Sequence, residues 1–327
     1  MATFEIGVIL PGVDVQRRDG VTLREAAGHA EDAGLDGVWH GDHLAIGGPT
    51  LDAPIALATA AAATSRITIG TSVFVPAIRP LAWAAKQIAS LQYVSDGRLV
   101  LGVGSGGGPG QWAAAGVPYT QRGHRTDTAL ELLPRLLAGE PVVFPTARSS
   151  PPHPPEPEPA ARHTAEPRQA ASRDGGPVVR LAPAVAMPPV WVGNASAAAI
   201  RRAARLGDGW FPSLISPEEV AAGRERLAGL AAAHGRPTPL VAIGGTSALG
   251  ADPGVPSREE VASGIRSAYG RSLEEALGIP LTGSPEQAAE RLAAYREAGA
   301  THAIIGVAGG DWRTQVDLLA ETARLLR

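Results

Sequence analysis

The densest group of titratable side chains in the chain is His40, Asp42 and His43, at the end of a short apolar segment. Imidazole and carboxylate groups at this spacing suit proton transfer, because an unperturbed imidazole titrates near neutral pH. The same groups suit a metal ion, as in barrel hydrolases. Three interpretations follow: Asp42 and His43 form an active-site pair, all three residues bind a metal, or His40 and Asp42 are structural.

Two further segments combine glycine with small polar residues: GVGSGGGPG at 102–110 and VGNAS at 192–196. Glycine permits positive φ angles and a close approach of the backbone to a flat or phosphorylated ligand. The second segment ends an apolar run and begins a helical pattern, so its backbone N–H groups and Ser196 favour a phosphate. A role for Ser196 limited to capping the helix explains that segment equally well.

The elements that must position these residues alternate between strand and helix. Short apolar runs stop abruptly at small or polar residues and helical segments follow them, which is the pattern of a parallel sheet. The expected strands are residues 5–10, 37–40, 67–74, 99–103, 190–193, 209–211, 240–244 and 302–307. Eight strand-then-helix units predict an α/β fold, a (β/α)8 TIM barrel, with its site at the carboxyl ends of the strands. An open doubly wound sheet is the alternative, and the absence of GxGxxG after the first strand weakens it.

We expect residues 1–327 to form one barrel domain with irregular insertions near residues 145–180 and 249–280, the second of which holds a short helix around residues 259–269. Residues 145–171 hold eight prolines and almost no large apolar side chains. Such a segment buries too little surface to offset the entropy lost on ordering it. We therefore expect residues 145–176 to be a disordered surface insertion, with a polyproline ligand as the alternative.

Composition argues against several classes of partner. The formal net charge of −3 gives no reason to expect nucleic acid or an anionic membrane as a partner. The lack of cysteine excludes disulfides, thiolate nucleophiles and cysteine-ligated metals. No apolar stretch approaches the ~20 residues that a membrane span needs, and the first residues lack the features of a signal peptide. We expect a cytoplasmic protein that acts on a small-molecule substrate.

Seven segments in a fixed order resemble the bacterial luciferase-like superfamily of flavin- and F420-dependent oxidoreductases, especially its branch that uses the deazaflavin coenzyme F420. They are GVWHGDH (37–43), IGTSVFVP (69–76), GRLVLGVGSG (97–106), PVWVGN (189–194), ARLGDGWF (204–211), GSPEQAAERLAAYREAGATH (283–302) and GGDWRTQVDLLAETARLL (309–326). The resemblance covers nearly the whole chain outside residues 145–176 and 250–277.

The resemblance implies roles for individual residues. Asp42 and His43 match the pair that faces the flavin, with His43 as the acid–base or charge-stabilising group. Ser72 and Val73 match the place of a non-prolyl cis peptide that supports the back of the ring. The other implied cofactor-binding residues are Gly104, Ser105 and Gly106 at the ring or its ribityl chain, and Gly193, Asn194, Ala195 and Ser196 at the phosphate.

One departure from the family pattern concerns the substrate. F420-dependent sugar-phosphate dehydrogenases of this type carry an acidic residue in the loop after the fourth strand, where this chain has Gly107 and Gly108. The resemblance therefore argues against a sugar-phosphate dehydrogenase.

The expected function is hydride transfer between coenzyme F420, which we prefer, or FMN and a small organic substrate. The nearest alternative is an FMN-dependent luciferase-like monooxygenase that uses O2. Two alternatives come from other classes: a metal-dependent TIM-barrel hydrolase built on His40, Asp42 and His43, and a flavin-binding protein without catalytic activity. The resemblance also implies a homodimer.

Overall fold

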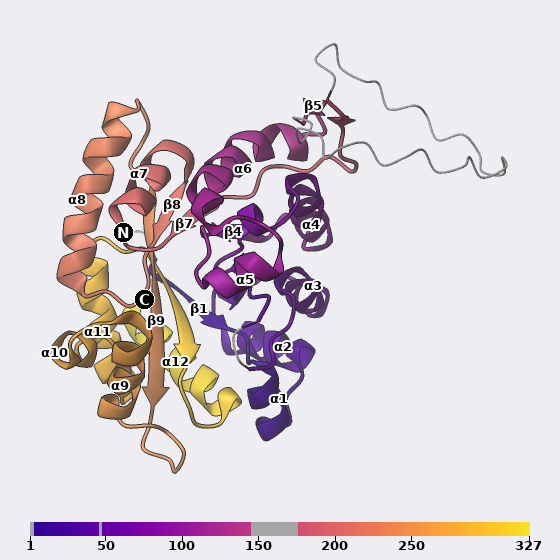
Figure 1. Ribbon diagram of the computed structural model, residues 1–327. Helices are drawn as coiled ribbons and strands as arrows, with labels where there is room; N and C mark the ends of the chain where they lie inside the picture. Colours follow the sequence, from indigo (N-terminus) through magenta and orange to yellow (C-terminus); the bar gives the residue numbers. More distant parts are fainter. Residues whose placement is uncertain (1–2, 46–47, 145–175) are drawn as a thin grey trace.

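A computed structural model describes residues 3–45, 48–144 and 176–327 (Figure 1). Eight parallel strands close into a barrel in the order in which they occur along the chain, because β8 pairs with β9 and β11 pairs with β1. The barrel strands are β1 Glu5–Ile9, β2 Gly37–His40, β3 Thr68–Thr71, β4 Leu99–Val103, β7 Val190–Gly193, β8 Gly209–Phe211, β9 Leu240–Leu249 and β11 His302–Val307. The predicted (β/α)8 barrel is confirmed.

Helices follow the strands and cover the outside of the barrel (Figure 1). They are α1 Val13–Asp19, α2 Leu23–Ala33, α3 Ala53–Ala63, α4 Leu81–Val94, α5 Pro109–Ala114, α6 Arg122–Leu137, α7 Ala197–Leu206, α8 Pro217–Ala233, α9 Arg258–Tyr269, α10 Leu273–Leu277, α11 Pro285–Glu297 and α12 Trp312–Leu326. Capping residues in the sequence determine where several of these helices begin. Thr22 and Glu25 form a capping box on α2, and Ser216 and Glu219 form another on α8. Such caps stabilise a helix by about 1 kcal/mol each.

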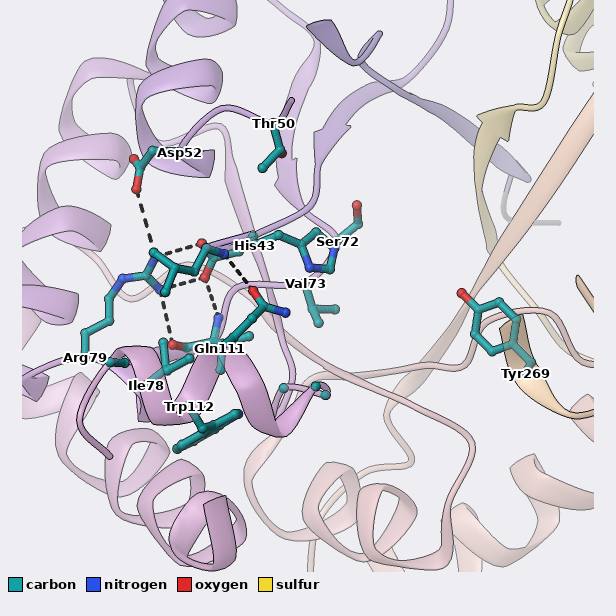
Figure 2. Close-up of a pocket in the computed structure, with 17 residues that line it drawn as sticks. His43, Thr50, Asp52, Ser72, Val73, Ile78, Arg79, Gln111, Trp112 and Tyr269 are labelled. Atoms are coloured by element: carbon teal, nitrogen blue, oxygen red, sulfur yellow. Dashed lines mark hydrogen bonds and ion pairs between the residues drawn. The ribbon is translucent and has the colours of Figure 1, made fainter. Parts of the chain in front are cut away.

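The loops after β2, β3 and β4 meet at the carboxyl end of the barrel, where their side chains converge (Figure 2). The loop after β2 leads into α3, and the segment after β3 passes through a short 3-10 helix at Pro76–Ile78 before α4. The loop after β4 contains α5, which the sequence did not predict. None of the helices in the described ranges is both long and apolar enough to cross a membrane.

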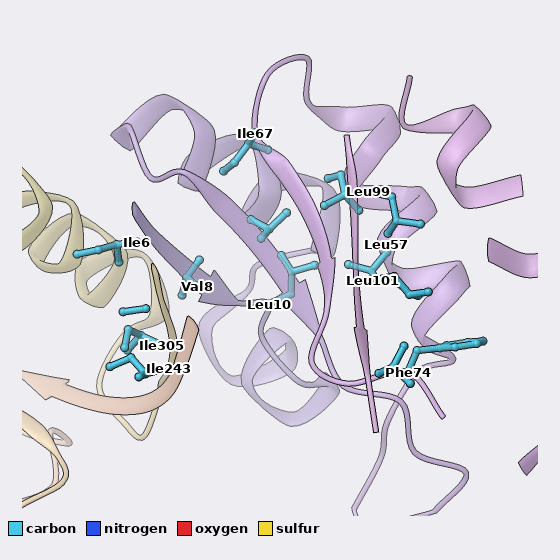
Figure 3. Packing of buried hydrophobic residues seen from close by; sticks show 14 of the residues in the cluster. Ile6, Val8, Leu10, Leu57, Ile67, Phe74, Leu99, Leu101, Ile243 and Ile305 are labelled. Atoms are coloured by element: carbon cyan, nitrogen blue, oxygen red, sulfur yellow. The ribbon is translucent and has the colours of Figure 1, made fainter. Parts of the chain in front are cut away.

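The core has two layers, because successive strand residues point to opposite sides of the sheet. Ile6 and Val8 of β1 point outward against the helices and are fully buried (Figure 3). Inside the barrel, Trp39 and Trp191 stack with their ring centroids 5.0 Å apart. Gly70 lies against the Trp39 ring, which would collide with any side chain at that position. The two tryptophans therefore fill part of the barrel interior, and Val73 packs against the buried cluster that they form.

The insertion expected near 249–280 is present between β9 and β11, and the short helix expected around residues 259–269 is α9, but the segment is more regular than expected. β9 continues to Leu249, and its last residues pair with β10 Leu281–Gly283, while α9 and α10 lie between these strands. Capping boxes start both helices, from Ser257 to Glu260 and from Ser272 to Glu275. These local signals were present in the sequence.

Two other segments differ from expectation or fall outside the described residues. The strand expected at 67–74 ends at Thr71, and Phe74 then forms an isolated bridge with Val103. A two-stranded antiparallel pair, β5 Val142–Val143 with β6 Val178–Val179, stands on either side of residues 145–175. The disorder expected for 145–176 thus concerns residues that lie almost entirely outside those described.

Candidate active site

Two adjoining cavities open at the carboxyl end of the barrel, with volumes of about 680 and about 410 Å³. Ser72, Val73, Gly106 and Gly107 line both, so the cavities form one trough with Val73 near its middle. The larger one, which we call the His43 cavity, holds His43 and Asp42 at its wall (Figure 2). The smaller one, which we call the Asn194 cavity, is lined by Gly193, Asn194 and Ala195.

Asp42 is tied into the wall of the His43 cavity. Its two carboxylate oxygens accept hydrogen bonds from the Arg79 guanidinium at 2.6 and 2.7 Å, and one of them also accepts from the Val75 N–H at 2.9 Å. Burial lowers the pKa of Arg79, but its bonds to Asp42 outweigh burial and raise that pKa above its ordinary value. These bonds join the loop after β2 to the segment after β3. The Asp42 carboxylate is nearly inaccessible to solvent.

His43 is the exposed member of the titratable group. Its ring points toward Ser72, and it has no hydrogen-bond partner among the described residues (Figure 2). The backbone that follows it is fixed, because Gln111 Oε1 accepts from the Leu44 N–H at 2.8 Å and from the Ala45 N–H at 3.3 Å. The Asp42 and Gln111 bonds hold the loop on both sides of His43 while the imidazole stays free to meet a ligand.

His40 is separated from this pair. It is buried at the end of β2, its Nδ1–H donates to the Gly41 carbonyl at 2.7 Å, and it does not line the trough. Burial lowers the pKa of His40 below its ordinary value. Within the described ranges no three His, Asp or Glu side chains gather closely enough to hold a metal ion. The structure therefore brings Asp42 and His43 to the cavity and leaves His40 in the barrel wall.

The peptide bond between Ser72 and Val73 is cis, so the non-prolyl cis peptide implied by the resemblance is present. The Val73 side chain lies over Gly104 and Gly193, and a Cβ at either position would collide with it. Part of the glycine pattern is thus explained by packing against Val73. The Ser72 hydroxyl is buried and has no hydrogen-bond partner in the described part of the chain.

The turn before α7 forms the far end of the Asn194 cavity. Asn194 has a φ of +87°, and its Oδ1 accepts from the Ser196 N–H at 2.8 Å. The Ser196 hydroxyl caps α7 by accepting from the Ala199 N–H at 3.3 Å, and Ser196 itself does not line the cavity. In the described structure the N–H groups of Ala195, Ala197 and Ala198 have no acceptor.

Several cavity residues were not among the predicted site residues, including Asp52, Arg79, Gln111, Tyr269 and Arg271. Arg271 lines the Asn194 cavity and pairs with Glu219 at 3.2 Å. Arg79 and Gln111 act on residues 37 and 67 positions away along the chain. No local motif marks such partners, because they are set by the packing of separate loops.

A family model described as luciferase-like monooxygenase matches residues 6–278. The chain belongs to this family. The resemblance read from the seven segments is therefore confirmed at the level of the family. The hydrolase alternative is set aside, since it belongs to a different class of enzyme.

Several curated proteins are similar to parts of the chain. An uncharacterized protein of Mycobacterium tuberculosis is 30% identical over 175 residues, which are 53% of this chain and 52% of that protein. The F420-dependent glucose-6-phosphate dehydrogenase of Kineococcus radiotolerans is 35% identical over 130 residues, 37% of this chain and 38% of that protein. The 4-hydroxyprotoasukamycin monooxygenase of Streptomyces nodosus is 34% identical over 122 residues, 36% of this chain and 33% of that protein. The matches thus span about half or less of these relatives.

Solved structures share the fold over almost the full chain. An F420-dependent secondary alcohol dehydrogenase has a TM-score of 0.77 at 16% identity, covering 99% of both chains. The oxygenating constituent of 3,6-diketocamphane monooxygenase from Pseudomonas putida, in complex with FMN, has a TM-score of 0.69 at 16% identity, with 99% of both chains covered. At such identities these likenesses show the fold alone. They include proteins named for F420 and for FMN, so the cofactor of this chain is a separate question.

Proposed function

We propose that the chain is an F420-dependent oxidoreductase that exchanges a hydride between F420 and a small organic substrate. The observation that carries the proposal is the continuity of the trough. His43 stands at one end, the turn at Asn194 and the start of α7 lie at the other, and Val73 lies between them. A flat ring on Val73 would reach both a proton donor and an anion site.

Several features of the trough fit such a cofactor. Ser72 and Val73 line both cavities and form the wall against which the ring would lie. The free N–H groups of Ala195, Ala197 and Ala198 stand at the positive end of the α7 dipole, which favours a phosphate. Arg271 places a guanidinium in the same cavity. Both of its terminal nitrogens bond the carboxylate of Glu219 at 3.2 Å, but Glu219 is exposed and does not line the cavity. F420 carries a charged tail beyond its phosphate, and exchange of this exposed carboxylate for the tail would favour F420 over FMN.

F420, when bound, supplies the ring carbon that gives or accepts the hydride. The residues of the chain then have three roles. His43 moves the proton that accompanies the hydride at the substrate oxygen, because its imidazole is free and exposed to the cavity. Asp42 and Gln111 hold the loop that carries His43. Val73, seated over glycines, supports one face of the ring.

The test is a titration of the purified protein with F420 and with FMN while tryptophan fluorescence is followed. Trp112 lies in the wall of the His43 cavity and reports on it. We expect saturable quenching by F420 and none by FMN. Saturable binding of FMN without F420 would contradict the proposal and favour an FMN-dependent monooxygenase. Binding of F420 without turnover over a broad substrate panel would favour a non-catalytic flavin-binding protein.

A further inference from the structure

The charges around the His43 cavity differ from those at the other end of the trough. Arg79 is the one permanent cation among the described residues that line this cavity. Both of its terminal nitrogens bond the Asp42 carboxylate, and one of them also donates to the Val75 carbonyl at 3.2 Å. Its guanidinium carbon lies 4.4 Å from the centroid of the Phe74 ring. The charge of Arg79 is therefore already paired with Asp42, and one face of its guanidinium is covered by Phe74.

Other arginines near the cavity are also engaged and do not line it. Arg125 donates to the Ala77 carbonyl at 2.7 Å and to the Arg79 carbonyl at 3.3 Å. Arg122 lies over the Tyr119 ring at 4.0 Å and donates to the Tyr119 carbonyl. Arg125 thus stabilises the segment after β3, and Arg122 stabilises the 3-10 turn Tyr119–Gln121 before α6. They are therefore not placed to bind a substrate.

Asp52 leaves the cavity with an excess of negative charge. It caps α3 by accepting from the Ile55 N–H at 3.2 Å, and its other oxygen is 4.0 Å from Arg79. Its side chain is 39% exposed and stands in the cavity wall. Two carboxylates, Asp42 and Asp52, therefore line the cavity against one guanidinium, that of Arg79.

The rest of the cavity wall is mixed and, among the described residues, carries no further charge. Its apolar lining residues are Leu44, Val73, Val75, Ile78, Trp112 and Ala115, and its polar ones are Thr50, Ser72, Gln111 and Tyr269. An anion that enters such a cavity loses water, meets no free cation and is repelled by Asp52. An uncharged molecule loses little and gains contact with the apolar part of the wall.

We propose that the His43 cavity selects an uncharged substrate and rejects anionic ones, phosphorylated sugars included. The inference rests on the proposed function, because it takes the His43 cavity as the substrate end of the trough. Under this proposal the trough has two ends. The Asn194 cavity, next to α7 and Arg271, binds the anionic part of the cofactor, and the His43 cavity binds the substrate and disfavours anions.

The test compares two probes that differ in charge and hardly in shape: 4-oxocyclohexanecarboxylate and its methyl ester. Their dissociation constants are measured by ligand-observed NMR at pH 7.5 on the full chain without cofactor. The Arg271→Gln background removes the cation of the neighbouring cavity. We expect the ester to bind at least tenfold more tightly than the carboxylate, a difference of about 1.4 kcal/mol.

Two matched variants locate the effect. Asp52→Asn removes the excess charge and keeps a good helix cap, because Asn caps helices as well as Asp does. It should lower the ratio of the two dissociation constants, that of the carboxylate divided by that of the ester, at least threefold. Asp311→Asn changes the equivalent cap of α12, which accepts from the Thr314 N–H and does not line the cavity, and it should leave the ratio unchanged.

The proposal is overturned if the carboxylate binds as tightly as the ester. It is also overturned if Asp52→Asn leaves the ratio of the two dissociation constants unchanged. The same holds if Asp311→Asn lowers this ratio as much as Asp52→Asn does. Failure of F420 and FMN to bind would count against the proposed function alone, since the ratio is measured without a cofactor.

Discussion

The two residues of the Asp42–His43 pair have different environments and therefore different roles. Asp42 is saturated by Arg79 and by the Val75 N–H, whereas His43 has no partner among the described residues and faces the cavity. A carboxylate held in this way cannot also take a proton from a reactant. We therefore assign proton transfer to His43 and positioning to Asp42, within the proposed function.

His43→Ala should lower turnover by about 10²–10⁴-fold, the range typical for loss of a general acid or base. Cofactor affinity should change little, because the proposed cofactor contacts lie at Val73 and at the turn before α7. The measurement is steady-state kcat together with the dissociation constant of F420 from the fluorescence titration. Full turnover by this variant, with cofactor bound, would remove His43 from the proposed mechanism.

His40 gives a prediction for stability against pH. Burial lowers the pKa of His40 in the folded chain, while the unfolded chain keeps a value near 6.5. The unfolded state then binds more protons below about pH 6.5, so this contribution is present above that pH and is lost as the pH falls through the folded pKa. His40→Asn retains an amide for the Gly41 carbonyl and removes the titration.

The measurement is the free energy of unfolding by urea at several pH values between 5 and 7.5. The stability of the unmodified chain should fall more steeply toward pH 5 than that of His40→Asn. Parallel curves for the two proteins would show that His40 does not titrate in this way.

At the scale of elements, the Val73 side chain joins the ends of three strands, β3, β4 and β7. Val73 follows β3 and lies against Gly104 after β4 and Gly193 at the end of β7. The shape of the trough therefore depends on small residues in two elements that make room for a branched residue from a third.

Gly104→Ala should destabilise the fold by about 1–3 kcal/mol, as overpacking of a tight contact does. Gly107→Ala is the matched control in the same loop, because a Cβ at Gly107 meets no atom within 4 Å. Thermal unfolding of both variants tests the idea. Equal melting temperatures for the two variants would show that the Val73 contact does not limit this position.

At the scale of the whole molecule, the outer faces of two neighbouring helices are unusually poor in charge. α3 contains no charged residue, and α4 contains only Lys86. Ile55 of α3 is 67% exposed, and Trp83 of α4 is 68% exposed. Because a face of this kind is complementary to a second copy of itself, we propose that the homodimer forms there.

Light scattering on the purified chain should report twice the 33.5 kDa mass of one copy. Ile55→Glu should shift the protein toward the monomer, because it places a charge in an uncharged contact. A substitution on a charged helix face, Glu225→Gln on α8, is the control and should leave the mass unchanged. A monomer at all concentrations would contradict the proposed dimer.

The sequence by itself determined the barrel and the places where its loops begin. Strand alternation, glycine stops and Ser, Thr and Asp caps act within a few residues, so β2, β4, β7, β8 and β11 appear within the expected bounds. The same local signals stand at Ser257, where a short helix was expected, and at Ser272, where an irregular segment was expected instead. The family segments, too, are runs of neighbouring residues, and they located His43, Val73 and Asn194 before any tertiary contact was known.

Only the tertiary structure decided what these residues do to one another. Arg79 neutralises Asp42, Gln111 fixes the backbone after His43, and Val73 explains why Gly104 and Gly193 lack side chains. Each of these contacts joins loops from different strands, at separations where sequence patterns carry no preference. Charge balance in a cavity likewise depends on which groups face one another across space, and local propensity has no means of encoding that.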